Sequence, residues 1–344
     1  MKFPFDPGLL PTAVGSLPHT DPQQALVLVK RFLPQLPTWP QLPRVAFGET
    51  MYAQFMLGLP GLLVDGERMC VDTAREFDDA IQQLLSDHEA GASQGYAISR
   101  GNACGLHAFL DNPPPAPLMV KGQITGPVST ALTITDEERR PLIYNDIMSD
   151  AIAKLLRLKA AWQEQKLKAA TTTTTMVWLD EPYMSSFGSG YLALERHQVI
   201  SLIDDVLEGL NGVRGVHCCG NTDWSVLLGT SIEVINYDAY NFAETLSLYP
   251  DEVKSFTGRG GVIAWGIVPN EESTLAGETA ASLKDRLEEA MAPFTRKGFR
   301  FQELVQRGLL TPSCGLSSLS PEAAGHALEL LSDLSALMRK RHGG

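Results

Sequence analysis

Residues 213–219 read Val-Arg-Gly-Val-His-Cys-Cys, a short β-like run that ends where Gly220 and Asn221 follow. Runs of this kind recur along the chain and alternate with stretches that carry apolar residues at helical spacing. Alternating strands and helices indicate a parallel sheet. The strands are predicted at 12–16, 44–49, 118–123, 174–180, 213–219, 233–238, 261–266 and 309–314, and the helices at 78–90, 139–168, 197–210, 282–297 and 321–340.

Eight such units in 344 residues predict one α/β domain over residues 1–344, a single closed (β/α)8 TIM barrel. An open doubly wound sheet is the alternative, but no Gly-x-Gly-x-x-Gly follows a predicted strand. The segment 58–117 is too long for one connection, so we expect extra helices there over one end of the barrel. The proline-rich segment 33–43 is expected to form a rigid loop.

The composition is that of an ordinary acidic globular protein, with 44% apolar residues, 20% charged residues and a formal net charge of -12. This charge argues against a nucleic-acid partner. No run approaches the roughly 18 apolar residues of a membrane span, and Pro4 and Pro7 interrupt the place where a signal peptide has its apolar region. We therefore expect no membrane association and a cytoplasmic protein. Five cysteines without regular spacing argue against a disulfide framework.

A candidate metal site begins with His217 and Cys219, which are two residues apart and so project from the same face of a strand. Such a pair by itself is more often a buried histidine beside a small apolar cysteine. Cys314 ends another predicted strand and favours a metal site instead. This soft ligand set suits tetrahedral Zn2+ and leaves a position for a substrate thiol. Cys218 should face away from the site and pack in the core.

Polar residues stand at the C-terminal ends of the predicted strands, where barrel active sites are built. Any one of them could simply cap the following helix. Asp180 is expected to point inward and, together with Glu49, to suit an ammonium group, whereas Glu181 is expected to make a salt bridge or a helix contact at the rim. The full set is Ser16, Glu49, Asp180, His217, Cys219, Asp238 and Cys314.

The chain resembles the catalytic domain of cobalamin-independent methionine synthase, within the wider group that also contains uroporphyrinogen decarboxylase and zinc methylcobamide:thiol methyltransferases. The resemblance covers nearly the whole chain and rests on short motifs in the family's order. They are Val14-Gly15-Ser16-Leu17-Pro18, Phe47-Gly48-Glu49, Thr125-Gly126-Pro127-Val128, Leu179-Asp180-Glu181-Pro182, His217-Cys218-Cys219 and Pro312-Ser313-Cys314-Gly315-Leu316.

For the substrate, the resemblance implies that Ser16 touches the amino acid and that Glu49 and Asp180 bind the amino group of homocysteine. It assigns no further catalytic residue beyond the zinc-thiolate site.

For the metal, the resemblance implies that His217, Cys219 and Cys314 hold Zn2+. The family's remaining ligand is a glutamate on the next strand. Asp238 stands there in this chain and is one methylene shorter, so either Asp238 or water is expected in the last position.

Two departures from the family concern the methyl donor. Full-length enzymes have a duplicated N-terminal barrel that helps to hold polyglutamylated folate, and this chain has residues for one barrel. The family's catalytic histidine is missing from residues 265–270, and Cys219-Gly220-Asn221-Thr222 resembles the corrinoid-dependent relatives. An N5-methylfolate needs protonation to leave, whereas a methylcorrinoid does not. We therefore expect a methylcorrinoid, free or on a carrier protein, to serve better than methyltetrahydrofolate.

The predicted function is zinc-dependent methyl transfer to the thiol of homocysteine, which forms methionine. Zinc keeps a bound thiol deprotonated near neutral pH, as this transfer requires. One alternative is a methylcobamide:thiol methyltransferase with a different acceptor thiol. Another is a non-catalytic barrel that binds zinc or an amino acid.

Overall fold

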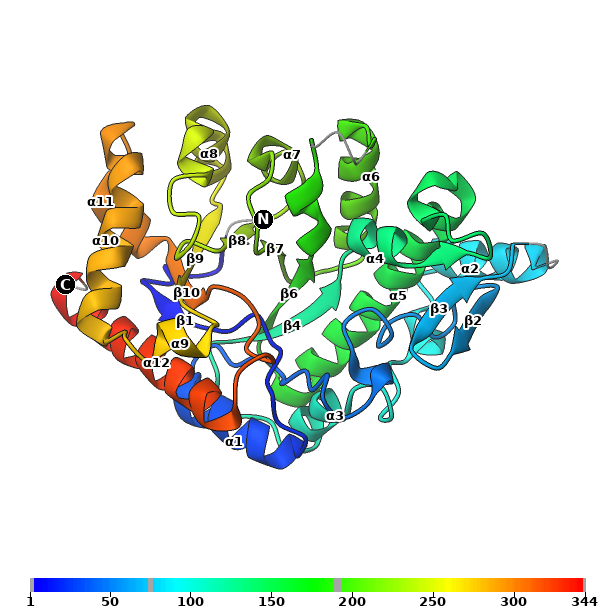
Figure 1. Ribbon diagram of the computed structural model, residues 1–344, viewed down its shortest axis with the longest axis horizontal. Coiled ribbons are helices and arrows are strands. Elements are labelled where there is room, and N and C mark those ends of the chain that lie inside the picture. The colour runs from blue at the N-terminus through cyan, green and yellow to red at the C-terminus, as the bar shows by residue number, and fades with distance from the viewer. Residues whose placement is uncertain (1–2, 74–76, 189–192, 343–344) are drawn as a thin grey trace.

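The computed structural model describes residues 3–73, 77–188 and 193–342. Its main sheet has seven strands in the order β1-β10-β9-β8-β7-β6-β4 and curls into part of a barrel, with helices around its outer side (Figure 1). All neighbouring strands of this sheet run parallel, which confirms the predicted α/β class. The strands are β1 (Leu10–Pro11), β4 (Met119–Thr125), β6 (Thr174–Asp180), β7 (Val213–Cys218), β8 (Val234–Tyr237), β9 (Val262–Val268) and β10 (Gly308–Pro312).

The sheet is buried on both faces. Every residue of β4 and of β9 is buried. This is expected for parallel strands, which here are covered by helices on the outer face and by side chains inside the curl on the other. Because side chains alternate along a strand, the larger apolar cluster lies between strands and helices and the smaller one fills the inside of the curl. The smaller cluster includes Met119, Met176 and Val213 near the strand starts, so the polar residues collect at the strand ends.

Helices follow most strands of the sheet. The longest is α5 (Asp146–Thr171), where the side chain of Asn145 accepts a hydrogen bond from the backbone N–H of Met148. The predicted helix 139–168 began too early, because a 3-10 helix at Leu142–Tyr144 precedes the Asn145 cap. The strand β5 (Thr135–Asp136) lies just before it. The others are α1 (Pro22–Phe32), α4 (Pro127–Thr133), α6 (Arg196–Leu207), α7 (Trp224–Leu228), α8 (Pro250–Gly258), α9 (Glu272–Leu275), α10 (Ala280–Arg296), α11 (Phe301–Gln306) and α12 (Pro321–His342).

The prediction of a closed eight-stranded barrel is wrong at its first two strands. The first strand of the sheet is the short β1 at Leu10–Pro11 rather than 12–16, where Ser16 makes an isolated bridge to Gln41. Residues 44–49 do not form a strand, and Phe47–Glu49 is a 3-10 helix. The sheet therefore ends at β1 on one side and at β4 on the other.

The proline-rich residues 35–41 lie between these two edges. They make isolated bridges, from Thr38 to Lys121 on the β4 side and from Gln41 to Ser16 on the β1 side. Two prolines interrupt this segment, and proline lacks the N–H that a ladder requires. The segment thus pairs at single points, where a regular barrel would have a strand.

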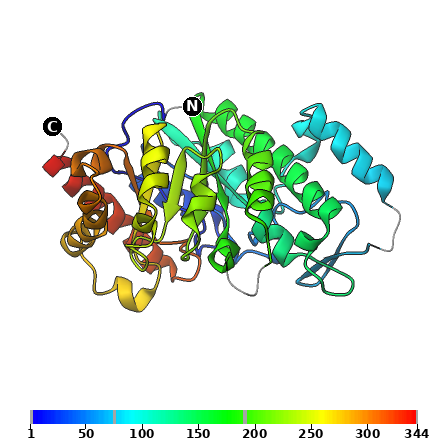
Figure 2. The ribbon, with the colours of Figure 1, turned by 90° about the horizontal axis from the view of Figure 1, so that it is seen from above.

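The segment 58–117 contains the expected extra helices, α2 (Asp78–Glu89) and α3 (Cys104–Asp111). It also contains an unpredicted hairpin, formed by β2 (Leu62–Asp65) and β3 (Arg68–Val71) and extended by β5. Figure 2 shows the hairpin and α2 at one end of the molecule. Across the part of the chain that the structure describes, no helix is long and apolar enough to cross a membrane.

Candidate metal centre

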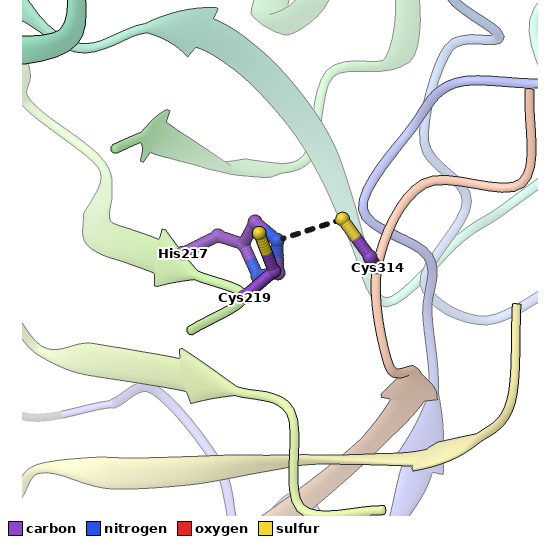
Figure 3. Close-up of side chains that lie close together, drawn as sticks. All are labelled: His217, Cys219 and Cys314. Atoms are coloured by element: carbon purple, nitrogen blue, oxygen red, sulfur yellow. Dashed lines mark hydrogen bonds between the residues drawn. The ribbon is translucent and has the colours of Figure 1, made fainter. Parts of the chain in front are cut away.

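The structure brings His217, Cys219 and Cys314 together, and their ligand atoms all lie within 4.8 Å of one another (Figure 3). His217 Nε2 is 3.6 Å from the Sγ atom of Cys314. His217 is buried and both cysteines are half-buried. Within the described residues, no other group of three or more His, Cys, Asp or Glu side chains meets this criterion.

Local strand geometry explains the convergence. On β7, His217 points to the inside of the sheet, whereas Cys218 points outward, is buried in the larger core cluster and donates a hydrogen bond from its Sγ to the carbonyl of Gly220. The expectation that Cys218 packs in the core is confirmed. At the end of β10 the pairing register with β9 shifts between Thr311 and Pro312, and Cys314 follows this irregularity.

The three side chains form an electron-rich group. A hydrogen bond with the Cys314 thiol, and then the neighbouring His217, lower the pKa of Cys219 to about 4 against the opposing effect of burial. The same hydrogen bond raises the pKa of Cys314 well above its usual value. Burial is the largest single effect on the pKa of His217 and lowers it. The Cys219 thiolate, the charge of Asp180 and the hydrogen bond with Asn236 together outweigh burial, so the net shift of the pKa is upward. A cation at this position would replace the shared protons.

Asp180 lies next to His217, because the two residues are partners in the β6–β7 ladder. Its Oδ1 atom is buried and has no hydrogen-bond partner among the described residues. Burial raises the pKa of Asp180 to about 6, and the charges of His217 and Lys121 limit this rise. A buried carboxylate oxygen without a partner is costly unless a ligand pairs with it.

Ser16 lies against the loop that carries Cys314. The backbone N–H of Leu316 donates a hydrogen bond to the carbonyl of Ser16, at 2.9 Å. A methyl group on Gly315 would come within 2.1 Å of the Ser16 Oγ atom, so the hydroxyl directly faces this loop.

The sequence predicted Glu49 at the end of a strand. The structure places it instead on the 3-10 helix Phe47–Glu49, which precedes β2. It is fully buried, and burial raises its pKa. Its carboxylate accepts hydrogen bonds from the backbone N–H of Cys104 at 2.6 Å and from the Gln54 side chain at 3.3 Å. Both oxygens therefore already have protein partners.

Asp238 follows β8 and is buried, and burial raises its pKa. Its two carboxylate oxygens accept hydrogen bonds from Asn241, one from the backbone N–H at 2.8 Å and one from the side-chain amide at 2.7 Å. Asp238 is not part of the His217, Cys219 and Cys314 group as the structure stands.

Glu181 makes the helix contact expected of it. Its carboxylate accepts hydrogen bonds from the backbone N–H groups of Val128 and Ser129 and from the Ser129 hydroxyl, at the start of α4. It thus satisfies N–H groups that the first turn of a helix leaves free.

Two inward-facing residues near the site, Asn236 and Lys121, were not predicted from the sequence to have a role. Asn236 Oδ1 is 2.6 Å from His217 Nδ1. Lys121 is fully buried, and its Nζ donates a hydrogen bond to the carbonyl of Val14 at 2.7 Å. Asn236 stands two residues before Asp238, and side chains two residues apart on a strand share a face. This alternation could have predicted that Asn236 faces the site, as Asp238 was expected to do.

No protein-family model matches the chain, and no curated protein matches it in sequence. Solved structures do resemble it. A B12-independent methionine synthase from Shewanella sp. W3-18-1, in complex with selenomethionine, shares 17% identity and a TM-score of 0.62 over 97% of this chain and 98% of its own. A putative vitamin-B12-independent methionine synthase from Listeria monocytogenes shares 16% identity and a TM-score of 0.55, over 92% and 85%. A methyltransferase from Methanosarcina mazei shares 13% identity and a TM-score of 0.56, over 97% and 94%.

At this level of identity the likeness is one of fold. The chain has the same overall fold as these three proteins over nearly its whole length.

Proposed function

We propose that this protein is a zinc-dependent methyltransferase that moves a methyl group to the thiol of homocysteine and so forms methionine. The observation that carries the proposal is the convergence of His217, Cys219 and Cys314, with the unpartnered carboxylate oxygen of Asp180 on the adjacent strand. The motif resemblance and the fold shared with B12-independent methionine synthases support the same chemistry.

The donor set fits zinc, because one imidazole nitrogen and two thiolates are the soft ligands that Zn2+ prefers. His217, Cys219 and Cys314 would hold the ion and leave one position for the acceptor thiol or for Asp238, whose carboxylate accepts hydrogen bonds from Asn241. When bound, zinc would supply a thiolate acceptor near neutral pH.

The chain's own residues would orient the amino acid. The Asp180 carboxylate would pair with the ammonium group, and Ser16 would contact the amino acid from the loop beside Cys314. Fixing the amino acid at two points away from sulfur would hold the thiolate in line with the incoming methyl group, which lowers the entropic cost of the transfer. The sulfur–carbon bond forms as the bond between methyl and donor breaks.

The donor is a methylcorrinoid or a methylated folate. The absence of histidine from residues 265–270 supports the corrinoid, since demethylation of a methylcorrinoid needs no proton donor. The corrinoid would come free or on a carrier protein.

A different acceptor thiol is the second candidate. The side chain of Glu49, the second carboxylate proposed to hold the ammonium group, is engaged by Cys104 and Gln54. Asp180 is then the one carboxylate of the predicted pair with an oxygen free to bind an ammonium group. Because the motifs predicted two such carboxylates, the structure weakens the argument for an acceptor with an amino group and favours a thiol that lacks one.

Metal content tests the site. Cys219→Ser and Cys314→Ser should each lower zinc occupancy from about one ion per chain to a small fraction, because each removes one of three ligands. Cys70→Ser, on the β2–β3 hairpin, is the matched control and should bind zinc as the wild type does. Full occupancy in both ligand variants would refute the proposed centre.

Methyl transfer tests the reaction. Methionine formation from homocysteine should be measured with methylcobalamin and with methyltetrahydrofolate, beside a set of thiols without an amino group. We expect zinc-dependent turnover that is faster with the corrinoid. Turnover of the simple thiols at equal or higher kcat/KM would favour the second candidate, and rapid turnover of the folate alone would reject the corrinoid.

A further inference from the structure

Asn236 lies at the inner face of β8 and is fully buried. It is the ladder partner of His217 on one side and of Ala264 on the other. Its side-chain amide uses both of its ends. The Oδ1 atom is 2.6 Å from His217 Nδ1, and the Nδ2 atom donates hydrogen bonds to the carbonyl of Ala264 at 2.9 Å and to the hydroxyl of Thr311 at 2.8 Å.

These contacts determine which way the amide points. A backbone carbonyl can only accept, so the atom of Asn236 that faces Ala264 must be the NH2 group. The opposite orientation would place two oxygen acceptors against each other in a buried site. The oxygen of Asn236 must therefore face His217.

The direction of the amide in turn determines the proton on His217. An amide oxygen accepts only, so Nδ1 of His217 must carry hydrogen. In the neutral ring the lone pair is then on Nε2, the atom that lies 3.6 Å from the Sγ of Cys314. The Nδ1–H form thus presents its free lone pair to the two cysteines.

We propose that Asn236 is a positioning residue that holds His217 in the Nδ1–H form and at a fixed ring angle, so that Nε2 is always the atom offered to the metal. This inference rests on the proposed zinc centre. Hydrogen bonds connect Thr311 on β10, Asn236 on β8 and His217 on β7. Cys314 follows β10 and Cys219 follows β7, so Asn236 links the two segments that carry the cysteines. Partners of this kind typically change metal affinity by roughly 10- to 100-fold.

The first experiment is 15N NMR of the histidine rings in the full-length protein, metal-free at a pH where His217 is neutral and again with zinc. His217→Gln assigns the signal. The wild type should show Nδ1 as the protonated nitrogen in both samples. Asn236→Leu removes the acceptor at similar volume, and its metal-free ring should show mostly Nε2–H, the form favoured by a free imidazole side chain. A wild-type ring protonated at Nε2 would refute the proposal without any variant.

The second experiment is zinc affinity by chelator competition. Asn236→Leu should weaken binding by about 10- to 100-fold. Asn236→Asp keeps an oxygen acceptor for Nδ1–H, so it should restore most of the affinity. Thr311→Val is the matched control: it also removes a hydrogen bond of Asn236 but leaves the contact with His217, so zinc affinity should change less than about threefold.

The outcomes separate the two proposals. If wild-type His217 is protonated at Nδ1 but the protein binds no zinc, the proposed function fails while Asn236 still orients the ring. If zinc binds and folded Asn236→Leu keeps both the Nδ1–H form and the affinity of Thr311→Val, the role of Asn236 is refuted and the zinc centre stands. Should Asn236→Leu fail to fold, the wild-type spectrum and Asn236→Asp still decide.

Discussion

At Asp180, a carboxylate has left water without gaining a hydrogen bond for one of its oxygens. Such an arrangement lowers stability, and it is typical of a site that a ligand completes. The neighbouring charges of His217 and Lys121 favour the ionised form, although burial still raises the pKa to about 6. The residue is therefore ready to bind a cation near neutral pH.

We predict that Asp180→Asn raises the KM for homocysteine by about tenfold or more and leaves zinc bound, because a charge-assisted hydrogen bond contributes roughly 1.5–3 kcal/mol. In the wild type, KM should also rise as pH falls below about 6, where the carboxyl becomes protonated and loses its attraction for ammonium. The variant should lack this pH effect. Asp223→Asn, at the cap of α7, is the control and should leave KM unchanged. Zinc loss in Asp180→Asn would move this residue from the substrate to the metal.

Among the elements, α4 depends on close contact with the end of β6. Gly126 precedes the helix with ordinary extended backbone angles, so conformational freedom does not explain the glycine. Lack of space explains the glycine. A Cβ atom at position 126 would lie 2.2 Å from the Glu181 carboxylate, which accepts hydrogen bonds from Val128 and Ser129.

Gly126→Ala should therefore lower the free energy of unfolding by about 1–3 kcal/mol, since neither the helix nor the buried carboxylate can move freely. Gly258→Ala is the matched control at the last residue of α8, where no atom lies within 4 Å of the added methyl group. It should be neutral or slightly stabilising, because alanine loses less backbone entropy than glycine. Urea unfolding measures both, and equal effects would show that the contact at Gly126 is unimportant.

On the scale of the whole molecule, the sheet is completed between β1 and β4 by buried side chains. Lys121 reaches from β4 to the carbonyl of Val14 and lies over the ring of Trp178, 4.5 Å from its centroid. Thr38 donates a hydrogen bond to the Gln123 side chain at 2.8 Å. These contacts link the edges where the proline-rich segment supplies only isolated bridges.

Lys121 should make stability depend on pH. Burial lowers its pKa to about 7 from 10.5, so between these values the unfolded chain binds the extra proton and stability rises with pH. The slope from this group is at most about 1.4 kcal/mol per pH unit. Lys121→Met should lose this slope in urea unfolding at pH 7 to 9, whereas Lys168→Met on the exposed surface of α5 should keep it. Parallel curves for Lys121→Met and the wild type would contradict the assignment.

The parallel sheet and much of the metal group could be predicted from short-range patterns. Strand 174–180 coincides with β6, and helix 78–90 agrees with α2 to one residue. Strand geometry has a period of two residues, so the spacing of His217 and Cys219 predicted that their side chains point to the same side. Their ligand atoms do lie close together, although β7 ends at Cys218. Such patterns depend only on residues that are close in the sequence, so they can be recognised without knowledge of the tertiary structure.

Short-range patterns were enough to predict the parallel α/β class, six strands of the main sheet and the candidate ligands. Three features could be seen only in the folded chain: residues 35–41 stand where a strand was expected at 44–49, Glu49 is held by Cys104, and Asn236 faces His217. Each of these depends on which distant segments meet across the sheet. Periodicity and propensity describe the direction of a side chain, whereas its partner is set by packing of the whole chain.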